Sequence, residues 1–413
     1  MKRSFVARPA DLLSVDEAQR RILSRFARLE PETIPLSESL GRVLAKPILA
    51  DMHLPPFANS SMDGFALVST DTEHATQDEP VLLSVTDRIP AGSAVIVRIS
   101  PGRSARIMTG APLPTGANAV IPFELVEERD GAIAVFARVQ SGACVRPAGQ
   151  DVRPGQSALE PGTVMHAPQI GLTAALGHRV VIVTRRPRVA ILSTGDELVD
   201  PGTPLSPGQI YNSNTPMLGA AVTEAGGISL SLPSAGDDPT TIASILEGAG
   251  NCDLLLTSGG ASVGDFDHVK DVLGRGGEIS FWRVRVRPGK PLIFGSLSGT
   301  PVIGLPGNPT SAMVTFEEFV RPAIGTMLGT RPFRTEIDVV LDERIDNGGG
   351  RRTYARVRLS YRDGAFHARL AGDQDSAKLL PLSQADGLLI ISEDRAEMNP
   401  GEKATVQVWH LPK

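Results

Sequence analysis

Three stretches in the second half of the chain decide its fold: RVAILSTGDEL (188–198), CDLLLTSGGASVGDFD (252–267) and TPVIGLPGNPTSA (300–312). Each is an apolar run followed by a turn rich in glycine or proline and then by a polar segment. Near-continuous apolar runs are typical of buried parallel strands. Ligands of open α/β sheets bind beyond the carboxyl ends of such strands. The sequence therefore predicts three turns that converge on one crevice.

Acidic and basic residues follow these predicted strands. Four carboxylates lie in the turns: Asp196, Glu197, Asp265 and Asp267. Four cations follow in the segment FWRVRVRPGKP: Arg283, Arg285, Arg287 and Lys290. Carboxylate oxygens suit a hard divalent cation, and guanidinium groups suit oxyanions. The pattern predicts a site that holds a divalent metal beside an anionic substrate.

The arginine run has two interpretations. On a continuous strand, a spacing of two would place Arg283, Arg285 and Arg287 on one face. That face would either bind an anion or form a solvated edge that discourages the addition of another strand. The following Pro-Gly pair leaves Lys290 at a bend, which favours a specific contact for this side chain.

A formal match to the nucleophile elbow of α/β-hydrolases lies at Gly260-Ala-Ser262-Val-Gly264. Asp342 and His367 follow in an order that a catalytic triad would allow. The elbow requires its serine directly after a strand, whereas this apolar run stops near Thr257. The pattern therefore disfavours a hydrolase.

Composition excludes several classes of protein. The chain has 413 residues, of which 41% are hydrophobic and 21% charged, as in an ordinary soluble protein. Aromatic residues at 4% and a net charge of −5 argue against nucleic-acid binding. No apolar run is long enough to span a membrane, and the N-terminus does not resemble a signal peptide. The two cysteines, Cys144 and Cys252, are far apart in sequence, which favours a reducing cytoplasm.

The order of predicted elements indicates a multidomain chain with α/β and β parts. Residues 187–330 alternate strand and helix, which predicts a mostly parallel α/β domain. Short β-like runs predict a β-rich insert at 52–151. This insert interrupts a discontinuous helical and mixed domain at 1–51 and 152–186. Residues 331–413 contain only strand-like runs, which predicts a C-terminal domain resembling a β-barrel.

Two helices are predicted in detail. Ser14 and Glu17 form a capping box, in which the hydroxyl and the carboxylate each satisfy an amide of the first turn. Helical spacing of apolar residues then continues to near Leu29. A single helix is expected over 310–326, after the turn that contains Pro306 and Pro309.

Six motifs together resemble one known family. They are NSSMDGFA (59–66), RIMTGAPLPTGANAV (106–120), STGDEL (193–198), TSGGASVGDFD (257–267), RPGKP (287–291) and LPGNP (305–309). The chain is similar over nearly its whole length to the molybdopterin molybdenumtransferases, the MoeA family, which includes the gephyrin E domain. The resemblance implies an elongated homodimer of four-domain subunits, with the site between the α/β domain of one subunit and the β module of the other.

The resemblance also implies a reaction. Molybdate and adenylyl-molybdopterin are the substrates, Mg²⁺ assists, AMP leaves and molybdenum enters the dithiolene. The implied partners are an adenylyltransferase that supplies the substrate and molybdoenzymes that receive the product. Nucleic acid and membrane are not expected partners.

Site residues are implied position by position. The catalytic set is Asp63, Thr109, Asp151, Glu197 and Asp267. The substrate-binding set is Ser258, Gly259, Gly260, Ser262, Arg283, Arg287, Lys290, Pro306, Gly307, Asn308, Pro309, Arg351 and Ser376. The metal set is Glu197, Asp237, Asp238 and Asp267.

Departures from the family pattern leave two alternatives. Gln150 stands where the family has glutamate, and Arg283 and Arg287 stand where it has lysine. Arginine keeps the charge but is wider and forked, which alters oxyanion geometry. The alternatives are a pterin or nucleotide phosphohydrolase without metal insertion, and a non-catalytic scaffold.

Overall fold

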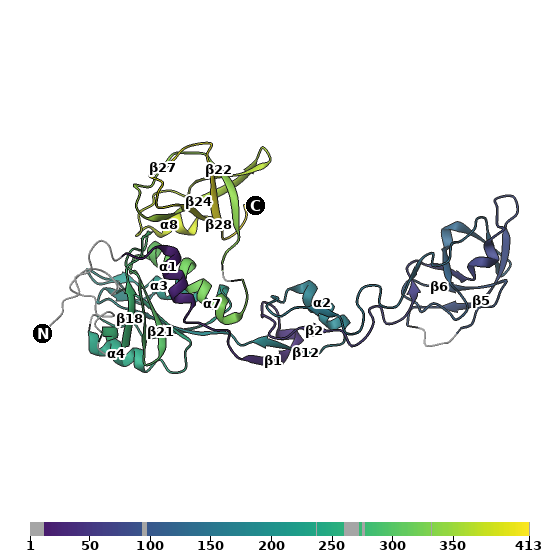
Figure 1. Cartoon of the computed structure of the whole chain (residues 1–413), viewed down its shortest axis with the longest axis horizontal. Helices are drawn as coiled ribbons and strands as arrows, with labels where there is room; N and C mark the ends of the chain where they lie inside the picture. Colours follow the sequence, from purple (N-terminus) through teal and green to yellow (C-terminus); the bar gives the residue numbers. More distant parts are fainter. Residues whose placement is uncertain are drawn as a thin grey trace. The chain divides into compact units, whose positions relative to one another are not determined.

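The computed structural model describes residues 12–92, 97–236, 238–259, 272–274, 277–331 and 333–412. Within these ranges the chain forms two compact units (Figure 1). The first comprises Met1–Glu32, Gly41–Ala45 and Ile182–Lys413, and the second comprises Thr33–Leu40 and Lys46–Val181. No helix in the described ranges is both long and apolar enough to cross a membrane.

The first unit contains an α/β body. Among the residues that the structure describes, this body is built on a six-stranded sheet with the strand order β16-β13-β17-β21-β20-β18. Strands β16, β13, β17 and β21 are parallel, whereas β20 and β18 are antiparallel. The strands are β13 (Arg188–Ser193), β16 (Ile228–Ser231), β17 (Leu254–Ser258), β18 (Gly277–Trp282), β20 (Ile293–Leu297) and β21 (Thr300–Leu305). A small parallel pair, β14 (Leu198–Val199) and β15 (Ile210–Tyr211), follows the first strand. The predicted mostly parallel sheet is confirmed.

Helices cover the sheet, which explains why the sequences of these strands are nearly continuous apolar runs. Helix α4 (Pro239–Glu247) packs on Ala190, Leu192 and Leu255. Helix α3 (Asn214–Glu224) lies against β13 and β16, and α6 (Pro309–Thr315) lies against β21. Every residue of β17 is buried as a result. A strand that is covered on both faces of the sheet buries all of its side chains. Its sequence is therefore continuously apolar and does not alternate between apolar and polar residues.

The predicted helix over 310–326 is present in three pieces. Helix α6 is followed by a π-helical turn, Phe316–Val320, and by α7 (Arg321–Leu328). Proline follows the first residue of α7, and it lacks the N–H that a regular helix would use at this point. Helix α7 ends at Gly329 in a left-handed conformation (φ 72°).

Two local predictions were wrong. Helix α1 (Val15–Leu23) ends well before Leu29, although the hydroxyl of Ser14 accepts from the N–H of Glu17 at 3.2 Å as predicted. The Glu17 carboxylate instead pairs with Arg20 and Arg21 of the same helix. The continuous arginine strand is also absent, because Arg283 has φ 112° and separates β18 from β19 (Val286–Arg287).

The C-terminal barrel is confirmed. Strands β24, β25, β22, β28 and β26 pair in that order, and β26 returns to β24, so the described sheet closes on itself. The strands are β22 (Glu336–Leu341), β24 (Arg352–Arg362), β25 (Ala365–Leu370), β26 (Gly387–Ile391) and β28 (Lys403–Val408), with β23 (Ile345–Asp346) pairing separately with β27 (Glu397–Met398). A short helix, α8 (Leu379–Ser383), was not predicted.

The β-rich insert in the second unit is also confirmed as a fold class. Its six-stranded sheet of described residues has the order β7-β4-β6-β5-β9-β8, with apolar clusters around Phe65 and Ile107. Its strands are β4 (Gly64–Leu67), β5 (Val81–Ile89), β6 (Arg103–Ile107), β7 (Ala119–Pro122), β8 (Val126–Arg129) and β9 (Ala132–Val135). The second unit also contains the small pairs β3 (Asn59–Ser60) with β10 (Val145–Arg146) and β2 (Ile48–Leu49) with β11 (Ser157–Leu159), and the helix α2 (Ala167–Ala175). A further pair joins β1 (Pro31–Pro35) and β12 (Val180–Thr184), whose residues are divided between the two units.

The predicted four-domain division, at 1–51 with 152–186, 52–151, 187–330 and 331–413, stays a prediction. The two compact units divide the chain differently, since α1 belongs to the first unit. There the side-chain amide of Gln19 donates to Glu318 in the π-helical turn.

Candidate functional site

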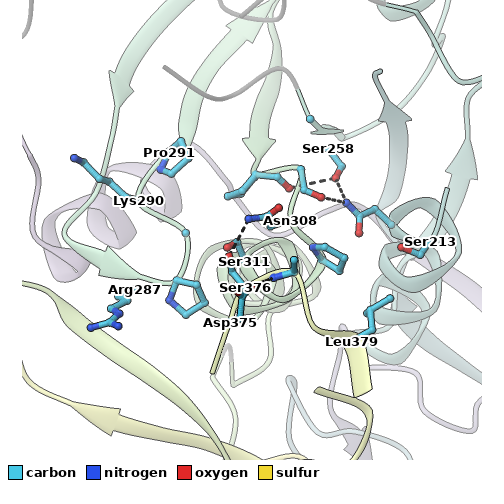
Figure 2. Close-up of a pocket in the computed structure, with 18 of the residues that line it drawn as sticks. Ser213, Ser258, Arg287, Lys290, Pro291, Asn308, Ser311, Asp375, Ser376 and Leu379 are labelled. Atoms are coloured by element: carbon cyan, nitrogen blue, oxygen red, sulfur yellow. Dashed lines mark hydrogen bonds between the residues drawn. The ribbon is translucent and has the colours of Figure 1, made fainter. Parts of the chain in front are cut away.

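An open pocket of about 1080 Å³ lies in the first unit, where the carboxyl ends of β13, β17 and β21 face the barrel. Figure 2 shows Arg287 and Lys290 on one side of this pocket and Ser213 and Ser258 on the other. The predicted residues that line it are Glu197, Ser258, Gly259, Arg287, Lys290, Pro306, Gly307, Asn308, Pro309, Arg351 and Ser376. Segments distant in sequence therefore meet at the predicted edge of the sheet.

Close backbone approach explains the glycines of two turns. Gly259 has φ 95°, and a Cβ there would lie 2.6 Å from the carbonyl oxygen of Thr194. Gly195 has φ 147°, and a Cβ there would lie 2.4 Å from the Glu197 carboxylate. A larger residue at 259 would push the turns after β13 and β17 apart, whereas at 195 it would displace the Glu197 carboxylate and adopt a strained positive φ.

Asn214, which the sequence did not single out, joins three parts of the pocket. It stands at the start of α3 and is 9% exposed. Its Nδ2 donates to the Ser258 hydroxyl at 2.8 Å and to the Gly307 carbonyl at 2.7 Å. One amide thus ties the end of β17 to the turn after β21. Its position inside YNSNTP is the only sequence signal, since asparagine is common at helix starts for local reasons alone.

The α/β body and the barrel meet at the other side of the pocket. The side chain of Asn308 donates to the Ser376 hydroxyl at 2.8 Å, and the N–H of Thr310 donates to the Ser376 carbonyl at 3.1 Å. Arg356 is 1% exposed and donates to the Thr310 hydroxyl at 2.8 Å and to the Asp375 carbonyl at 3.0 Å. Burial lowers the pKa of this guanidinium. The barrel loop before Ser376 is thereby held against the start of α6.

The cationic side of the pocket comes from β19 and the bend after it. Arg287 is exposed and pairs with Thr353 in the parallel register of β19 and β24, and its guanidinium donates to the Asn347 carbonyl at 2.9 Å. Lys290 is also exposed. Arg283, in contrast, is not among the residues that line the pocket, and its guanidinium lies 4.3 Å from the ring of Trp282. Of the four basic residues in the predicted substrate-binding set, Arg287, Lys290 and Arg351 therefore line the pocket and Arg283 does not.

Predicted metal ligands are only partly brought together. Glu197 lines the pocket, whereas Asp238 caps α4. The hydroxyls of Thr240 and Thr241 and the Thr241 N–H donate to the Asp238 carboxylate, which lowers its pKa. Asp237, Gly260, Ser262 and Asp267 lie outside the described residues. Within the described ranges, no group of three His, Cys, Asp or Glu side chains is arranged to hold a metal.

Asp63 and Thr109 form a pair in the second unit. The N–H and the hydroxyl of Thr109 both donate to Asp63 Oδ1 at 2.7 Å. These two hydrogen bonds lower the pKa of the Asp63 carboxyl. Asp151 is exposed, and its N–H donates to the Leu54 carbonyl at 2.9 Å. Three strands, β4, β5 and β6, separate Thr109 from Asp63 in the sequence, and the fold brings the Thr109 donors to the exposed Asp63 carboxylate.

The acid and base of the disfavoured hydrolase motif do contact each other. His367 Nδ1 lies 2.8 Å from Asp342 Oδ1 in the barrel, and Arg362 pairs with the same carboxylate. Neither His367 nor Asp342 is among the residues that line the pocket. Together with Arg362, they form a polar cluster of the barrel.

The fold and the pocket together define a class of protein: a multidomain α/β chain with a polar, cation-lined pocket between a mostly parallel sheet and a closed barrel. Comparison with known families agrees with this architecture. Residues 13–177 match the MoeA N-terminal region (domain I and II), residues 190–326 match a probable molybdopterin binding domain, and residues 338–409 match the MoeA C-terminal region (domain IV).

Individual relatives agree over nearly the full chain. Molybdopterin molybdenumtransferase 2 of Mycobacterium tuberculosis is 40% identical over 406 residues, which cover 96% of this chain and 99% of the relative. Molybdopterin molybdenumtransferase of Bacillus subtilis is 34% identical over 96% of this chain and 93% of its own. The crystal structure of molybdopterin biosynthesis MoeA protein from Pyrococcus horikoshii has a TM-score of 0.84 at 28% identity and covers 97% of this chain. The chain belongs to the molybdopterin molybdenumtransferase family.

Proposed function

We propose that this chain inserts molybdenum from molybdate into adenylylated molybdopterin with release of AMP, a late step of molybdenum cofactor synthesis. Family membership supports the reaction. The observation that carries the proposal is the pocket, which is lined by the cations Arg287 and Lys290 together with the carboxylate Glu197. Neither alternative, phosphohydrolase nor scaffold, is favoured by an observation of its own.

The proposed chemistry has two balanced parts. Water attacks one phosphorus of the phosphoanhydride, the P–O bond to the other phosphate breaks, and AMP departs, leaving molybdopterin with its terminal phosphate. The two dithiol sulfurs then bond to molybdenum, and their two protons leave with one oxo group of molybdate as water. Arg287 and Lys290 would hold the oxyanions side by side, so that the two substrates react as if joined.

Magnesium fits this pocket by donor type. Mg²⁺ is usually bound through one or two carboxylates together with substrate phosphates, and Glu197 offers such an oxygen ligand. Asp267 remains a proposed ligand from outside the described residues. Asp238 is a weaker candidate because its carboxylate already accepts three hydrogen bonds. When bound, the ion would neutralise phosphate charge.

A test of the reaction follows AMP release from adenylyl-molybdopterin with Mg²⁺, in the presence and absence of molybdate. Release that molybdate stimulates, with molybdenum found in the pterin product, supports insertion. Release indifferent to molybdate would instead support the phosphohydrolase. Tight substrate binding with no release would support the scaffold.

The second unit would contribute to the site across a homodimer. In this proposal, the Asp63–Thr109 pair and Asp151 of one subunit complete the pocket of the other. Mixing the full-length variants Asp63→Asn and Lys290→Ala tests it, since a mixed dimer would carry one intact site. Recovered activity on mixing supports sharing, whereas two inactive proteins that stay inactive after subunit exchange would contradict it.

Two further proposals concern setting and partners. The enzyme would act in the cytoplasm, receive its substrate from an adenylyltransferase and pass its product to molybdoenzymes. Cell fractionation tests the first. Cross-linking of the full chain during turnover tests the second, and partners captured equally without substrate would argue against a handover.

A further inference from the structure

Arg356 is a buried cation of the barrel that holds residues of the pocket without lining it. It stands on β24, is 1% exposed and is not among the residues that line the pocket. Within the described residues its guanidinium donates only to uncharged acceptors: Thr310 Oγ1 at 2.8 Å, the Asp375 carbonyl at 3.0 Å, the Asp373 carbonyl at 3.2 Å and Gln374 Oε1 at 3.3 Å. A buried charge that loses such bonds is very costly, so these acceptors are held in place.

Three of the four acceptors belong to one barrel loop, residues 373–376. Gln374 is also held by the backbone of Arg356, because its Oε1 accepts from the Arg356 N–H at 2.9 Å and its Nε2 donates to the Arg356 carbonyl at 3.2 Å. Gln374, Asp375 and Ser376 all line the pocket. The planar fork of one arginine thus fixes the backbone of a loop on the barrel side of the pocket.

The fourth acceptor, Thr310, joins this loop to the α/β body. Its N–H donates to the Ser376 carbonyl at 3.1 Å, and its hydroxyl donates to the Lys378 carbonyl at 3.1 Å. The nearby Asn308 donates to the Ser376 hydroxyl at 2.8 Å, as a dashed line in Figure 2 shows. Ser376 is therefore held at the junction between the barrel and the α/β body.

The peptide between Asp375 and Ser376 decides which way the Ser376 N–H points. This peptide is trans, and in a trans peptide the C=O and the N–H point in opposite directions. Since the Asp375 carbonyl accepts from the buried guanidinium, the Ser376 N–H points away from Arg356, to the side on which Ser376 lines the pocket. Among the described residues, no acceptor binds this N–H. The Ser376 hydroxyl accepts from Asn308 and keeps its own proton to donate.

The charges of the pocket are compatible with an anion at Ser376. Asp375 is the acid of this loop that lines the pocket, and its carboxylate accepts from the Ala377 N–H at 2.8 Å. The cations Arg287, Lys290 and Arg351 line the same pocket. The two donors of Ser376 would add to these cations at an oxyanion without adding a further charge.

We infer that Arg356 is a positioning residue, which turns the Asp373 and Asp375 carbonyls inward and thereby presents the N–H and the hydroxyl of Ser376 to an oxyanion in the pocket. Arg356 touches no substrate and acts through the loop 373–376. Donors that are fixed before the ligand binds stabilise an oxyanion without a cost of reorganisation. The identity of this oxyanion as molybdate rests on the proposed function.

Arg356→Lys tests the inference in the full-length protein, because lysine keeps the charge but loses the fork that reaches four acceptors. Molybdate alone is the probe, and equilibrium dialysis well below the melting temperature measures its dissociation constant. Arg356→Lys should weaken molybdate binding about tenfold, as expected for the loss of one hydrogen bond to a charged group. Wild-type affinity in Arg356→Lys, or no binding of molybdate by the wild type, would overturn the inference.

A double-mutant cycle with Ser376→Ala separates positioning from a general loss of stability. Ser376→Ala should weaken molybdate binding about fivefold in the wild-type background, but less than about twofold in the Arg356→Lys background, where the hydroxyl is no longer held in place. Losses that simply add would show that Arg356 does not act through Ser376, whatever the melting temperatures of the variants.

Two further variants separate the orientation of the loop from the charge of Arg356. Gln374→Ala leaves the cation in place but removes its second hold on the loop, and should also weaken molybdate binding. Unchanged affinity in Gln374→Ala would contradict the role of the loop. The matched control is Arg358→Met, since Arg358 stands on the same strand, donates to Gln384 and does not line the pocket. An equal loss of affinity in Arg358→Met would mean that any cation of this strand has the same effect.

An NMR readout concerns the N–H itself and is independent of turnover. In protein with isotope-labelled serine, the Ser376 amide signal is the one that Ser376→Ala removes. Saturating molybdate should shift this signal in the wild type and leave it unmoved in Arg356→Lys. An unmoved signal in a wild type that binds molybdate would overturn the N–H as a donor. If the signal shifts but the wild type releases no AMP, the proposed function fails while the role of Arg356 stands.

Discussion

The residues that line the pocket come from segments between Thr194 and Leu379, whereas Asp63 and Thr109 in the second unit hold each other by two direct hydrogen bonds. In the pocket, several groups are held by partners in other elements, such as the amide of Asn214, which joins two turns. In the insert, the Asp63 carboxylate is held by the N–H and the hydroxyl of a single residue, Thr109. Substitutions should therefore disturb fold and function together in the pocket, and function alone in the insert.

The largest effect is expected for Lys290→Ala in the pocket. Loss of a cation aimed at an oxyanion costs catalysis about 10²–10³-fold in comparable sites, so kcat/KM for AMP release should fall by that order. Arg283→Ala is the matched control, since Arg283 stacks on Trp282 and does not line the pocket. Equal losses in both variants would mean that the pocket lining does not identify the substrate-binding cations.

Asn214→Ala should disturb both fold and function. The substitution leaves the buried Ser258 hydroxyl and the Gly307 carbonyl without their donor, which should lower the free energy of unfolding by about 2 kcal/mol. Urea unfolding followed by circular dichroism measures this change. Ser213→Ala is the control, because its side chain makes no capping bond, and its stability should match the wild type. If both variants are equally stable, Asn214 does not hold the two turns together.

Asp63→Asn sharpens the comparison from the side of the insert. Turnover should fall more than about tenfold if this carboxylate acts on the substrate. The melting temperature should stay near that of the wild type because the pair is exposed. The hydrogen bonds from Thr109 lower the pKa of the Asp63 carboxyl from its usual value. Asp63 therefore stays ionised at neutral pH, and any stability it adds is lost only as the pH falls through this lowered pKa. A variant that unfolds readily would show that the pair is structural.

The smallest effect is expected for Asp238→Ala. Removal of a helix cap should speed amide exchange in the first turn of α4, whereas turnover and its dependence on Mg²⁺ should stay unchanged. Asp238→Asn should keep most of the cap, since asparagine also accepts from these donors. If Asp238→Asn loses its dependence on Mg²⁺, Asp238 is a metal ligand after all.

Much of the site could be predicted because it lies where strands end. The apolar runs 188–198, 252–267 and 300–312 indicated three parallel strands, and β13, β17 and β21 lie adjacent in the sheet. Their turns meet at one edge for topological reasons. Glu197, Ser258 and Asn308 could thus be placed together from the sequence. Lys290 followed from the bend after the arginine run.

The local spacing of residues did not predict where a strand ends. A spacing of two suggested one strand through Arg283, yet φ 112° at that residue turns the backbone and sends its side chain onto Trp282. The capping-box pattern likewise predicted that the Glu17 carboxylate turns back to the helix start, whereas it pairs with Arg20 and Arg21. In both cases the alternatives differ by a few dihedral angles, and side-chain contacts select among them.

The sequence alone determined the family, the mostly parallel sheet and the edge at which the pocket opens. It could do so because local residue patterns indicate which strands are buried and where turns follow them. Only the tertiary structure decided which of these residues share the pocket, which carboxylate became a helix cap and which buried acid lacks a cation. Glu317 and Glu318 are adjacent and chemically identical in the sequence. Arg321 lies one helical turn after Glu317, but Arg334 and Tyr354, which complete their different surroundings, are brought to them by the fold.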